Sequence, residues 1–141
     1  MPEQTENDWS NHYPWHLAEY NKIARFFSAL NESRIETTQC KKCGTTQWPP
    51  RSICSNCLSD DLIWVEIPKT GKIVGFSKAY VGLNAGEEAP ILVAAVHLEG
   101  GLRILTRILG AKYEELRVDM PVKLKKAALV DGKPYWAFSP L

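Results

Sequence analysis

Four cysteines are arranged as two Cys-x-x-Cys pairs, Cys40–Cys43 and Cys54–Cys57, with ten residues between the pairs. Each pair directs two thiolates at one spot, and two such pairs complete the tetrahedron of sulfur ligands that Zn²⁺ accepts in structural sites. All four ligands are thiolates, so no coordination position stays open for water. The spacing therefore predicts a structural zinc site, not a catalytic one.

Other uses of the cysteines fit less well. A disulfide framework would suit a secreted protein, but the first ten residues are polar and acidic and do not resemble a signal peptide. A thioredoxin-like redox site needs one Cys-x-x-Cys at a strand-to-helix junction, not two matched pairs. Iron in a rubredoxin-like site stays open, although such sites usually space the pairs further apart. Zinc-compatible cysteines indicate a reducing compartment, and the cytoplasm is the expected location.

An amphipathic pattern precedes the cysteines and predicts one helix, or two short ones, between residues 15 and 30. Apolar side chains recur there at steps of three and four residues. This face either packs on the same chain or docks a partner, and the sequence leaves both open. The candidate docking residues are Trp15, Ile23, Phe26, Phe27 and, within the predicted ribbon, Trp48.

The remaining chain has the pattern of strands. Strands at 34–39 and 62–67 flank the cysteines, and further strands are predicted at 72–81, 91–98, 102–109, 122–130 and 134–138. Turns are predicted at Glu99-Gly100-Gly101 and Asp131-Gly132, and one or two helical turns at 112–116. Three strands, a short helix and two strands follow the order of an OB-fold, although other small barrels stay open.

The predicted fold class is α+β and mainly β. We expect an N-terminal helical segment at residues 1–34, a rubredoxin-like zinc ribbon at 35–67 and a five-stranded OB-fold barrel at 68–141. The 141 residues are 45% apolar and carry a net charge of +1, which argues against a polyanion as the main partner. No apolar run approaches the length of a membrane span.

Catalytic patterns do not stand out in the sequence. The three histidines are His12, His16 and His97, and no Ser-His-Asp arrangement or phosphate loop is recognisable. A thiolase needs a reactive cysteine, whereas all four cysteines here are assigned to metal. We therefore expect this chain not to be an enzyme by itself.

Several motifs together resemble a known family. The first pair continues into Gly44, and Trp48-Pro49-Pro50-Arg51 lies between the two pairs. Matching segments elsewhere are Phe26-Phe27-Ser-Ala-Leu30, Gly71-Lys-Ile-Val, Gly100-Gly101-Leu102-Arg103, Met120-Pro121-Val122 and Ala137-Phe138-Ser139-Pro140. Over about residues 20 to 140 the chain resembles the zinc-ribbon plus OB-fold "domain of unknown function" family, also called acyl-CoA-associated. One departure is Asn31-Glu32-Ser33, where the family often has glycine.

The resemblance implies an accessory role. Family members are commonly partners of thiolases, thiolase-like lipid-transfer proteins and related acyl-CoA enzymes. The barrel is expected to help hold coenzyme A or acyl-CoA at the interface, while helix and ribbon dock the larger subunit. Phosphates attract Arg and Lys, and pantetheine fits apolar or aromatic grooves. The candidate coenzyme A residues are Arg51, Phe76, Lys78, Tyr80, Arg103 and Arg107.

Two alternatives remain at this point. A single-stranded nucleic-acid binder would use stacking aromatics with a basic cluster at Lys123, Lys125 and Lys126, although the balanced charge disfavours it. The aromatic candidates for stacking are Trp48, Trp64, Tyr80 and Trp136. A ligand-free, zinc-stabilised scaffold is the second alternative.

Overall fold

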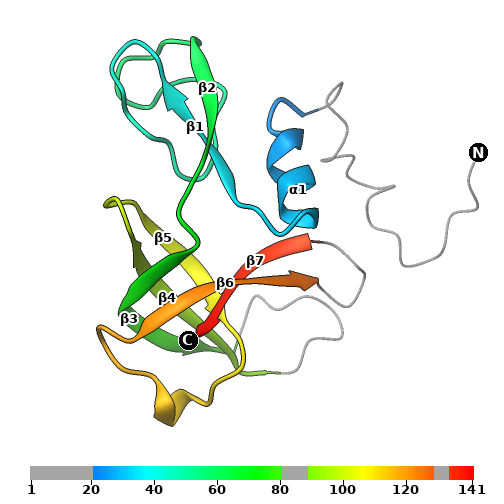
Figure 1. Cartoon of the computed structure of the whole chain (residues 1–141), viewed down its shortest axis with the longest axis vertical. Helices are drawn as coiled ribbons and strands as arrows, with labels where there is room; N and C mark the ends of the chain where they lie inside the picture. Colours follow the sequence, from blue (N-terminus) through cyan, green and yellow to red (C-terminus); the bar gives the residue numbers. More distant parts are fainter. Residues whose placement is uncertain (1–20, 81–88, 129–133) are drawn as a thin grey trace, which may run out of the picture. The chain divides into compact units, whose positions relative to one another are not determined.

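The computed structural model describes residues 21–80, 89–128 and 134–141 (Figure 1). The chain forms two compact units, one of residues 1–67 with 131–135 and one of residues 68–130 with 136–141. The part of the predicted helix at residues 15–20, which includes Trp15 and His16, lies outside the described residues. His12 and the predicted Asp131-Gly132 turn lie outside them too. In the described parts of the chain, no helix is long and apolar enough to cross a membrane.

One helix, α1 (Ala24–Asn31), is described in the first unit. Its buried side follows the helical period of Ala24, Phe26, Ala29 and Leu30, which explains why this stretch folds as a helix on the ribbon. The helix ends where backbone N–H groups of the next turn bond to the carbonyls of Ala29 and Leu30. Ser33 then adopts a φ of 60°, the left-handed conformation for which glycine is the usual residue.

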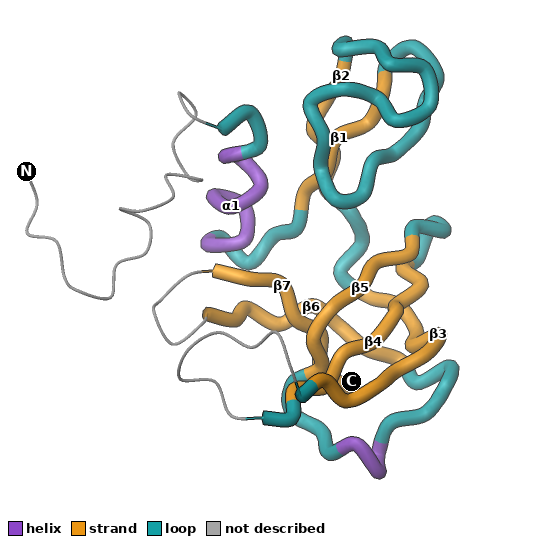
Figure 2. Tube along the Cα trace, turned by 180° about the vertical axis from the view of Figure 1, so that it is seen from behind, coloured by secondary structure: helices purple, strands orange, loops and turns teal. Residues whose placement is uncertain are grey.

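The ribbon is built on two antiparallel strands, β1 (Glu36–Cys40) and β2 (Leu62–Glu66). Their register pairs Glu36 with Glu66 and Cys40 with Leu62, so the first cysteine closes the strand. Figure 2 shows that long loops connect the ends of these strands, and both Cys-x-x-Cys segments belong to this region. The strands thus form a short stem for a loop-rich tip that carries both cysteine pairs.

The second unit is a closed barrel of five strands. These are β3 (Thr70–Ala79), β4 (Ile91–Leu98), β5 (Arg103–Ile108), β6 (Pro121–Ala128) and β7 (Pro134–Pro140). Their order around the barrel is β3-β4-β5-β7-β6, and a 3₁₀ turn, η2 (Tyr113–Glu115), lies between β5 and β6. This is the strand order of an OB-fold, so the predicted fold class is confirmed.

The barrel core comes from alternate positions on the strands. The buried set comprises Ile73, Ala94, Val96, Leu98, Ile104, Ile108, Leu116, Val122, Ala137 and Phe138. The positions between them on β4 and β5 face outward, as the period of two in a strand requires. At Gly71 the backbones of β3 and β4 approach each other closely, because a Cβ there would lie 2.6 Å from the carbonyl oxygen of His97. The turn at Gly100–Gly101 joins β4 to β5 with positive φ angles.

A β-bulge interrupts β3. Ile73 pairs with Val96 and Gly75 pairs with Ala95, so Val74 is an extra residue in the ladder. Ile73 is buried, Val74 is exposed, and Phe76 then pairs with the buried Ala94. The bulge therefore shifts the alternation by one and turns Phe76 to the inner side of the sheet.

Candidate metal centre

The four cysteine sulfurs converge at the tip of the ribbon. Their Sγ atoms all lie within 4.8 Å of one another. Cys40 Sγ is 3.6 Å from Cys57 Sγ, and Cys43 Sγ is 3.5 Å from Cys54 Sγ. Zn–S bonds of about 2.3 Å in a tetrahedron place the sulfurs about 3.8 Å apart. The predicted ligands therefore form a cluster of the size that a zinc ion needs.

Two matching backbone turns bring the sulfurs together. In the first turn the N–H of Gly44 donates to the carbonyl of Cys40, and the N–H of Cys40 donates to that of Thr45. In the second turn the N–H of Leu58 donates to the carbonyl of Cys54, and the N–H of Cys54 donates to that of Ser59. Gly44 and Leu58 both have positive φ, at 78° and 61°. The two pairs are thus held by the same local structure.

Two of the four thiols lose their protons more readily than a free cysteine, which favours a bound cation. Hydrogen bonding with Thr45 lowers the pKa of Cys43 to about 5. Hydrogen bonding with the backbone of Cys57 is the main cause of the lowered pKa of Cys54. For Cys57, the bond with the Ser59 backbone favours the thiolate, but burial and the neighbouring thiols outweigh it and raise the pKa to about 11. Four thiolates in one place repel, and a divalent cation among them removes that penalty.

A buried glutamine supports the cluster and was missed by sequence reasoning. The side-chain amide of Gln47 donates to Cys54 Sγ at 3.4 Å and to the carbonyl of Thr45 at 3.2 Å. Its carbonyl oxygen accepts from the backbone N–H and the hydroxyl of Ser55, at 3.1 and 2.8 Å. Gln47 therefore connects the two turns. Its residue type carries no ligand pattern, so no signal in the sequence marked it.

The predicted docking residues fall into two groups. Phe26 is only 3% exposed and meets the ring of Trp48 edge-on, with centroids 5.8 Å apart. That contact joins α1 to the ribbon within one unit, so Phe26 has almost no surface for a partner. Ile23, Phe27 and Trp48 are half-buried and keep some surface. Trp15 lies outside the described residues.

The predicted coenzyme A residues lie in different surroundings. Arg51 is exposed on the ribbon, where its backbone is tied to the hydroxyl of Thr38. Phe76 and Lys78 occupy the inner side of β3, and both contact Tyr113 of η2. The ring centroids of Phe76 and Tyr113 are 5.5 Å apart, and Lys78 Nζ lies 4.6 Å from the Tyr113 centroid. Tyr80 follows at the end of the strand and is 63% exposed.

The two arginines of β5 face outward together. Arg103 pairs with His97 and Arg107 pairs with Val93, both outward positions of β4. Four residues of strand separate their Cα atoms by about 13 Å. The two guanidinium groups therefore start well apart, and Leu105 lies between them on the same face.

Two family models match the chain, one over the zinc ribbon and one over the barrel. The "ChsH2, rubredoxin-like zinc ribbon domain" model matches residues 27–62, and the "ChsH2, C-terminal OB-fold domain" model matches residues 64–125. The first match contains all four cysteines. The second contains the barrel strands β3, β4 and β5.

Two curated relatives belong to acyl-CoA enzymes. A probable enoyl-CoA hydratase alpha subunit of Thermomonospora curvata is 32% identical over 101 residues, which are 72% of this chain and 32% of the relative. The benzoylsuccinyl-CoA thiolase subunit BbsA of Thauera aromatica is 30% identical over 95 residues, 67% of this chain and 65% of BbsA. The chain therefore spans about a third of the first relative's length and just under two thirds of the second's.

A solved structure shares both sequence and shape with the chain. A chain of the Ltp2-ChsH2(DUF35) aldolase is 29% identical and superposes with a TM-score of 0.72. The match covers 83% of this chain and 92% of that one.

Proposed function

The chain belongs to the ChsH2 (DUF35) family of zinc-ribbon and OB-fold proteins, and from this premise we propose that it is a non-catalytic subunit of a thiolase-type acyl-CoA complex. In this role it docks a larger, thiolase-fold catalytic subunit that forms or cleaves carbon–carbon bonds. The printed names of its relatives support the proposal, because they are subunits of acyl-CoA enzymes or part of an aldolase pair.

The observation that carries the proposal is the clustering of all four cysteines. A thiolase uses a reactive cysteine thiolate as its nucleophile. Here every cysteine sulfur lies within 4.8 Å of the other three, in a geometry that suits one shared metal ion. Zinc bound there by Cys40, Cys43, Cys54 and Cys57 would fix the fold of the ribbon. The nucleophile must then come from another chain.

The barrel is proposed to help hold the coenzyme A moiety. The cluster of Phe76, Lys78 and Tyr113, with the exposed Tyr80 directly after β3, supports this role. A cation over an aromatic ring can bind a phosphate while the rings contact pantetheine or adenine. Arg51, Arg103 and Arg107 stay as further proposed contacts to phosphates.

Purification of the native chain from its own cells tests the subunit role. We expect a larger thiolase-fold subunit to co-purify in a fixed ratio, identified by mass spectrometry, and the two purified chains to recombine. The mixed complex should catalyse an acyl-CoA reaction that the larger subunit alone performs slowly or not at all. A chain that stays monomeric and leaves the larger subunit's activity unchanged would contradict the proposal.

Titration with coenzyme A tests the ligand role separately. We expect the complex to bind coenzyme A more tightly than the larger subunit alone, and Lys78→Ala to reduce that gain. Lys69→Ala is the control, because Lys69 precedes β3 on the same segment. Equal binding with and without this chain would leave the docking role standing and remove the coenzyme A role.

A further inference from the structure

On the outer face of β3, β4 and β5, the strand register determines which side chains lie next to one another. One row across the three strands is Lys72–His97–Arg103, and the next is Gly75–Ala95–Leu105. All members of the first row are exposed. Directly paired residues point to the same side of a sheet, so each row is continuous on the surface.

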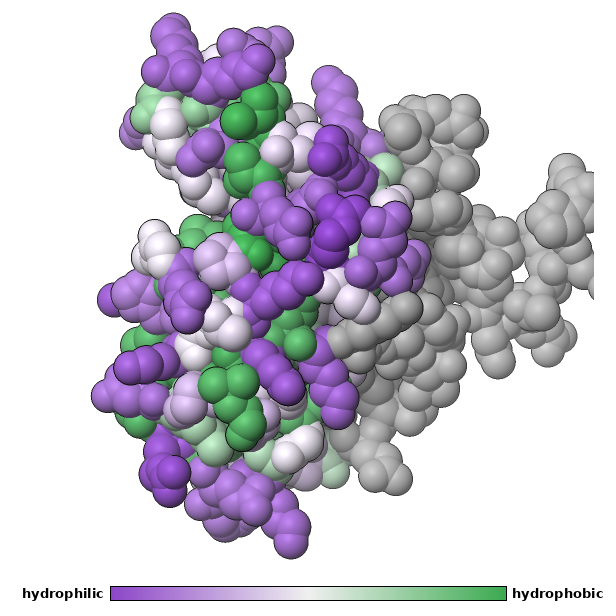
Figure 3. Space-filling view, viewed as in Figure 1, coloured by the Kyte–Doolittle hydropathy of each residue, from purple (hydrophilic) through white to green (hydrophobic). Residues whose placement is uncertain are grey.

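The second row is apolar and uncovered. Leu105 is 64% exposed, and Val74, pushed out by the bulge beside Gly75, is 41% exposed. A Cβ built on Gly75 would meet no atom within 4 Å, so the middle of this face is open. Figure 3 shows that hydrophobic residues reach the surface of the molecule in patches between hydrophilic ones. The barrel core does not need Leu105, which points away from it.

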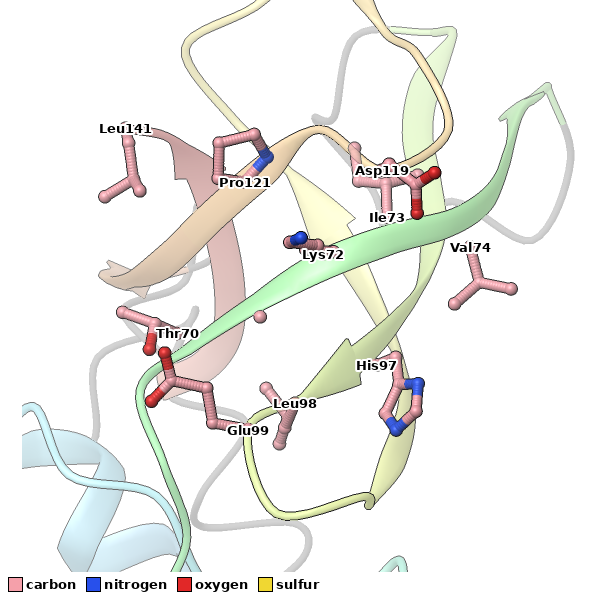
Figure 4. A pocket seen from close by; sticks show the side chains of 11 residues that line it. Thr70, Lys72, Ile73, Val74, His97, Leu98, Glu99, Asp119, Pro121 and Leu141 are labelled. Atoms are coloured by element: carbon pink, nitrogen blue, oxygen red, sulfur yellow. The ribbon is translucent and has the colours of Figure 1, made fainter.

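A hollow of about 340 Å³ adjoins the cationic row. Lys72, Val74 and His97 line it from the strands, as Figure 4 shows, together with Pro121 and Leu141. A hollow of this volume can receive an apolar side chain of another molecule next to the exposed Val74.

The charges on this face have one sign. Strands β3, β4 and β5 contain no Asp or Glu, and their outward charged residues are Lys72, Arg103 and Arg107, with His97 beside them; Lys78 lies on the inner side. Among the described residues, the carboxylates of Glu99 and Asp119 line the hollow together with Lys72 and His97. Along β5, Leu105 lies between two arginines on the outward side. A complementary surface is therefore an apolar side chain flanked by carboxylates.

We infer that the outer face of β3–β5 is the docking surface for the catalytic subunit, which presents there an apolar segment flanked by Asp or Glu. This inference rests on the proposed function for the identity of the partner. A single-stranded nucleic acid would find few stacking partners here: the outward positions of β3, β4 and β5 carry no Phe, Tyr or Trp. The indole of Trp136 on β7 lies beside Leu105, to whose carbonyl it donates at 2.8 Å.

Paired substitutions in the full, zinc-loaded chain test this surface against the separately purified thiolase-fold subunit. Leu105→Asp and Arg103→Glu change the face. Val118→Asp and Arg117→Glu are their controls, because Val118 is 60% exposed and both residues lie in the segment between η2 and β6. Circular dichroism and zinc content confirm that each variant is folded.

We expect Leu105→Asp to weaken binding by about tenfold or more, since a leucine that becomes buried contributes about 1.5–3 kcal/mol. Arg103→Glu should weaken binding more at low salt than at high salt. Both controls should bind within about twofold of the unchanged chain.

Each other outcome rejects the inference in a recognisable way. If the unchanged chain binds the subunit and all four variants bind equally, the docking surface is wrong and the proposed function stands. If the unchanged chain binds no thiolase-fold subunit, both proposals fail. If Leu105→Asp instead dissolves a homodimer, or abolishes binding to an oligothymidine, another molecule occupies the face.

Discussion

Single side chains account for the most predictable and the least predictable parts of the site. The four zinc ligands could be read from the sequence, because Cys-x-x-Cys spacing alone places two sulfurs together. Gln47 could not, since its role depends on a buried position between two turns that are far apart along the chain. The helical spacing of Phe26 was compatible with packing inside the chain and with docking a partner. Its burial against Trp48 in the structure decides for packing.

Two glycines of β3 have opposite requirements for space. A Cβ at position 71 would lie 2.6 Å from the backbone oxygen of His97 and 3.0 Å from Cα of Leu98, whereas at position 75 it would meet nothing. We expect Gly71→Ala to lower the free energy of unfolding by about 1–3 kcal/mol, because backbone atoms must move.

Gly75→Ala should leave that free energy unchanged or raise it slightly, since alanine restricts the unfolded chain. Urea titrations followed by circular dichroism measure both variants. Equal effects of the two substitutions would contradict the close approach at Gly71.

A buried carboxylate joins the helix to the ribbon. Glu36 of β1 is 5% exposed and accepts a hydrogen bond from Arg25 of α1 at 2.8 Å, and another from Arg34. Burial alone raises the pKa of Glu36, but the hydrogen bonds from the two arginines outweigh it and lower that pKa below its ordinary value. The helix therefore stays in place through an ion pair as well as through Phe26.

Glu36→Gln should destabilise the first unit by about 1–3 kcal/mol at pH 7, because two charge-assisted hydrogen bonds are weakened. A carboxylate with a lowered pKa in the fold stabilises fully above its unfolded pKa and loses that contribution as the pH falls through the folded pKa. The difference between Glu36→Gln and the unchanged chain should therefore shrink below about pH 4.5.

Thermal unfolding at several pH values measures this difference, and comparing two proteins cancels the pH dependence that they share through the metal site. Glu32→Gln is the control, because Glu32 also pairs with Arg34 but its side chain is 64% exposed. A pH-independent difference would show that the Glu36 carboxylate is not the stabilising group.

Strand positions were well predicted, whereas the side that each residue of β3 faces could not be read from simple alternation. The predicted strand at 91–98 coincides with β4, and the others agree within about three residues at each end. The alternation of apolar residues and the Gly-Gly turn marked those boundaries. The bulge at Val74 left no such mark, so simple alternation along β3 would assign the wrong side to Phe76 and Lys78.

The chain as a whole contains two separate cores of different kinds. The ribbon has few buried apolar side chains beyond those under α1, and its tip is organised by the four sulfurs. Among its described residues the barrel has ten buried apolar side chains, nine of them on strands, and its closed sheet contains no metal-ligand cluster there. Chelation of the metal should therefore unfold the ribbon and leave the barrel folded.

We expect a strong chelator to unfold the ribbon, because a structural zinc contributes about 10–16 kcal/mol of apparent folding free energy. Two-dimensional amide NMR spectra should lose the dispersed signals of residues around Cys40 and Cys54 while signals of Ile104 and Val96 keep their positions. Restoring Zn²⁺ should restore the lost signals. Loss of all dispersed signals together would mean that the two cores unfold as one.

The extra residue in β3 has a consequence for how this protein can change over evolutionary time. Removing Val74 would turn β3 into a regular strand, because Ile73 would still pair with Val96 and Gly75 with Ala95. Phe76 and Lys78 would keep their places beside Tyr113. Loss of a residue elsewhere in the strand would exchange inside for outside beyond it. Position 74 is therefore where descendants can lose a residue of β3 without changing the sides that its other residues face.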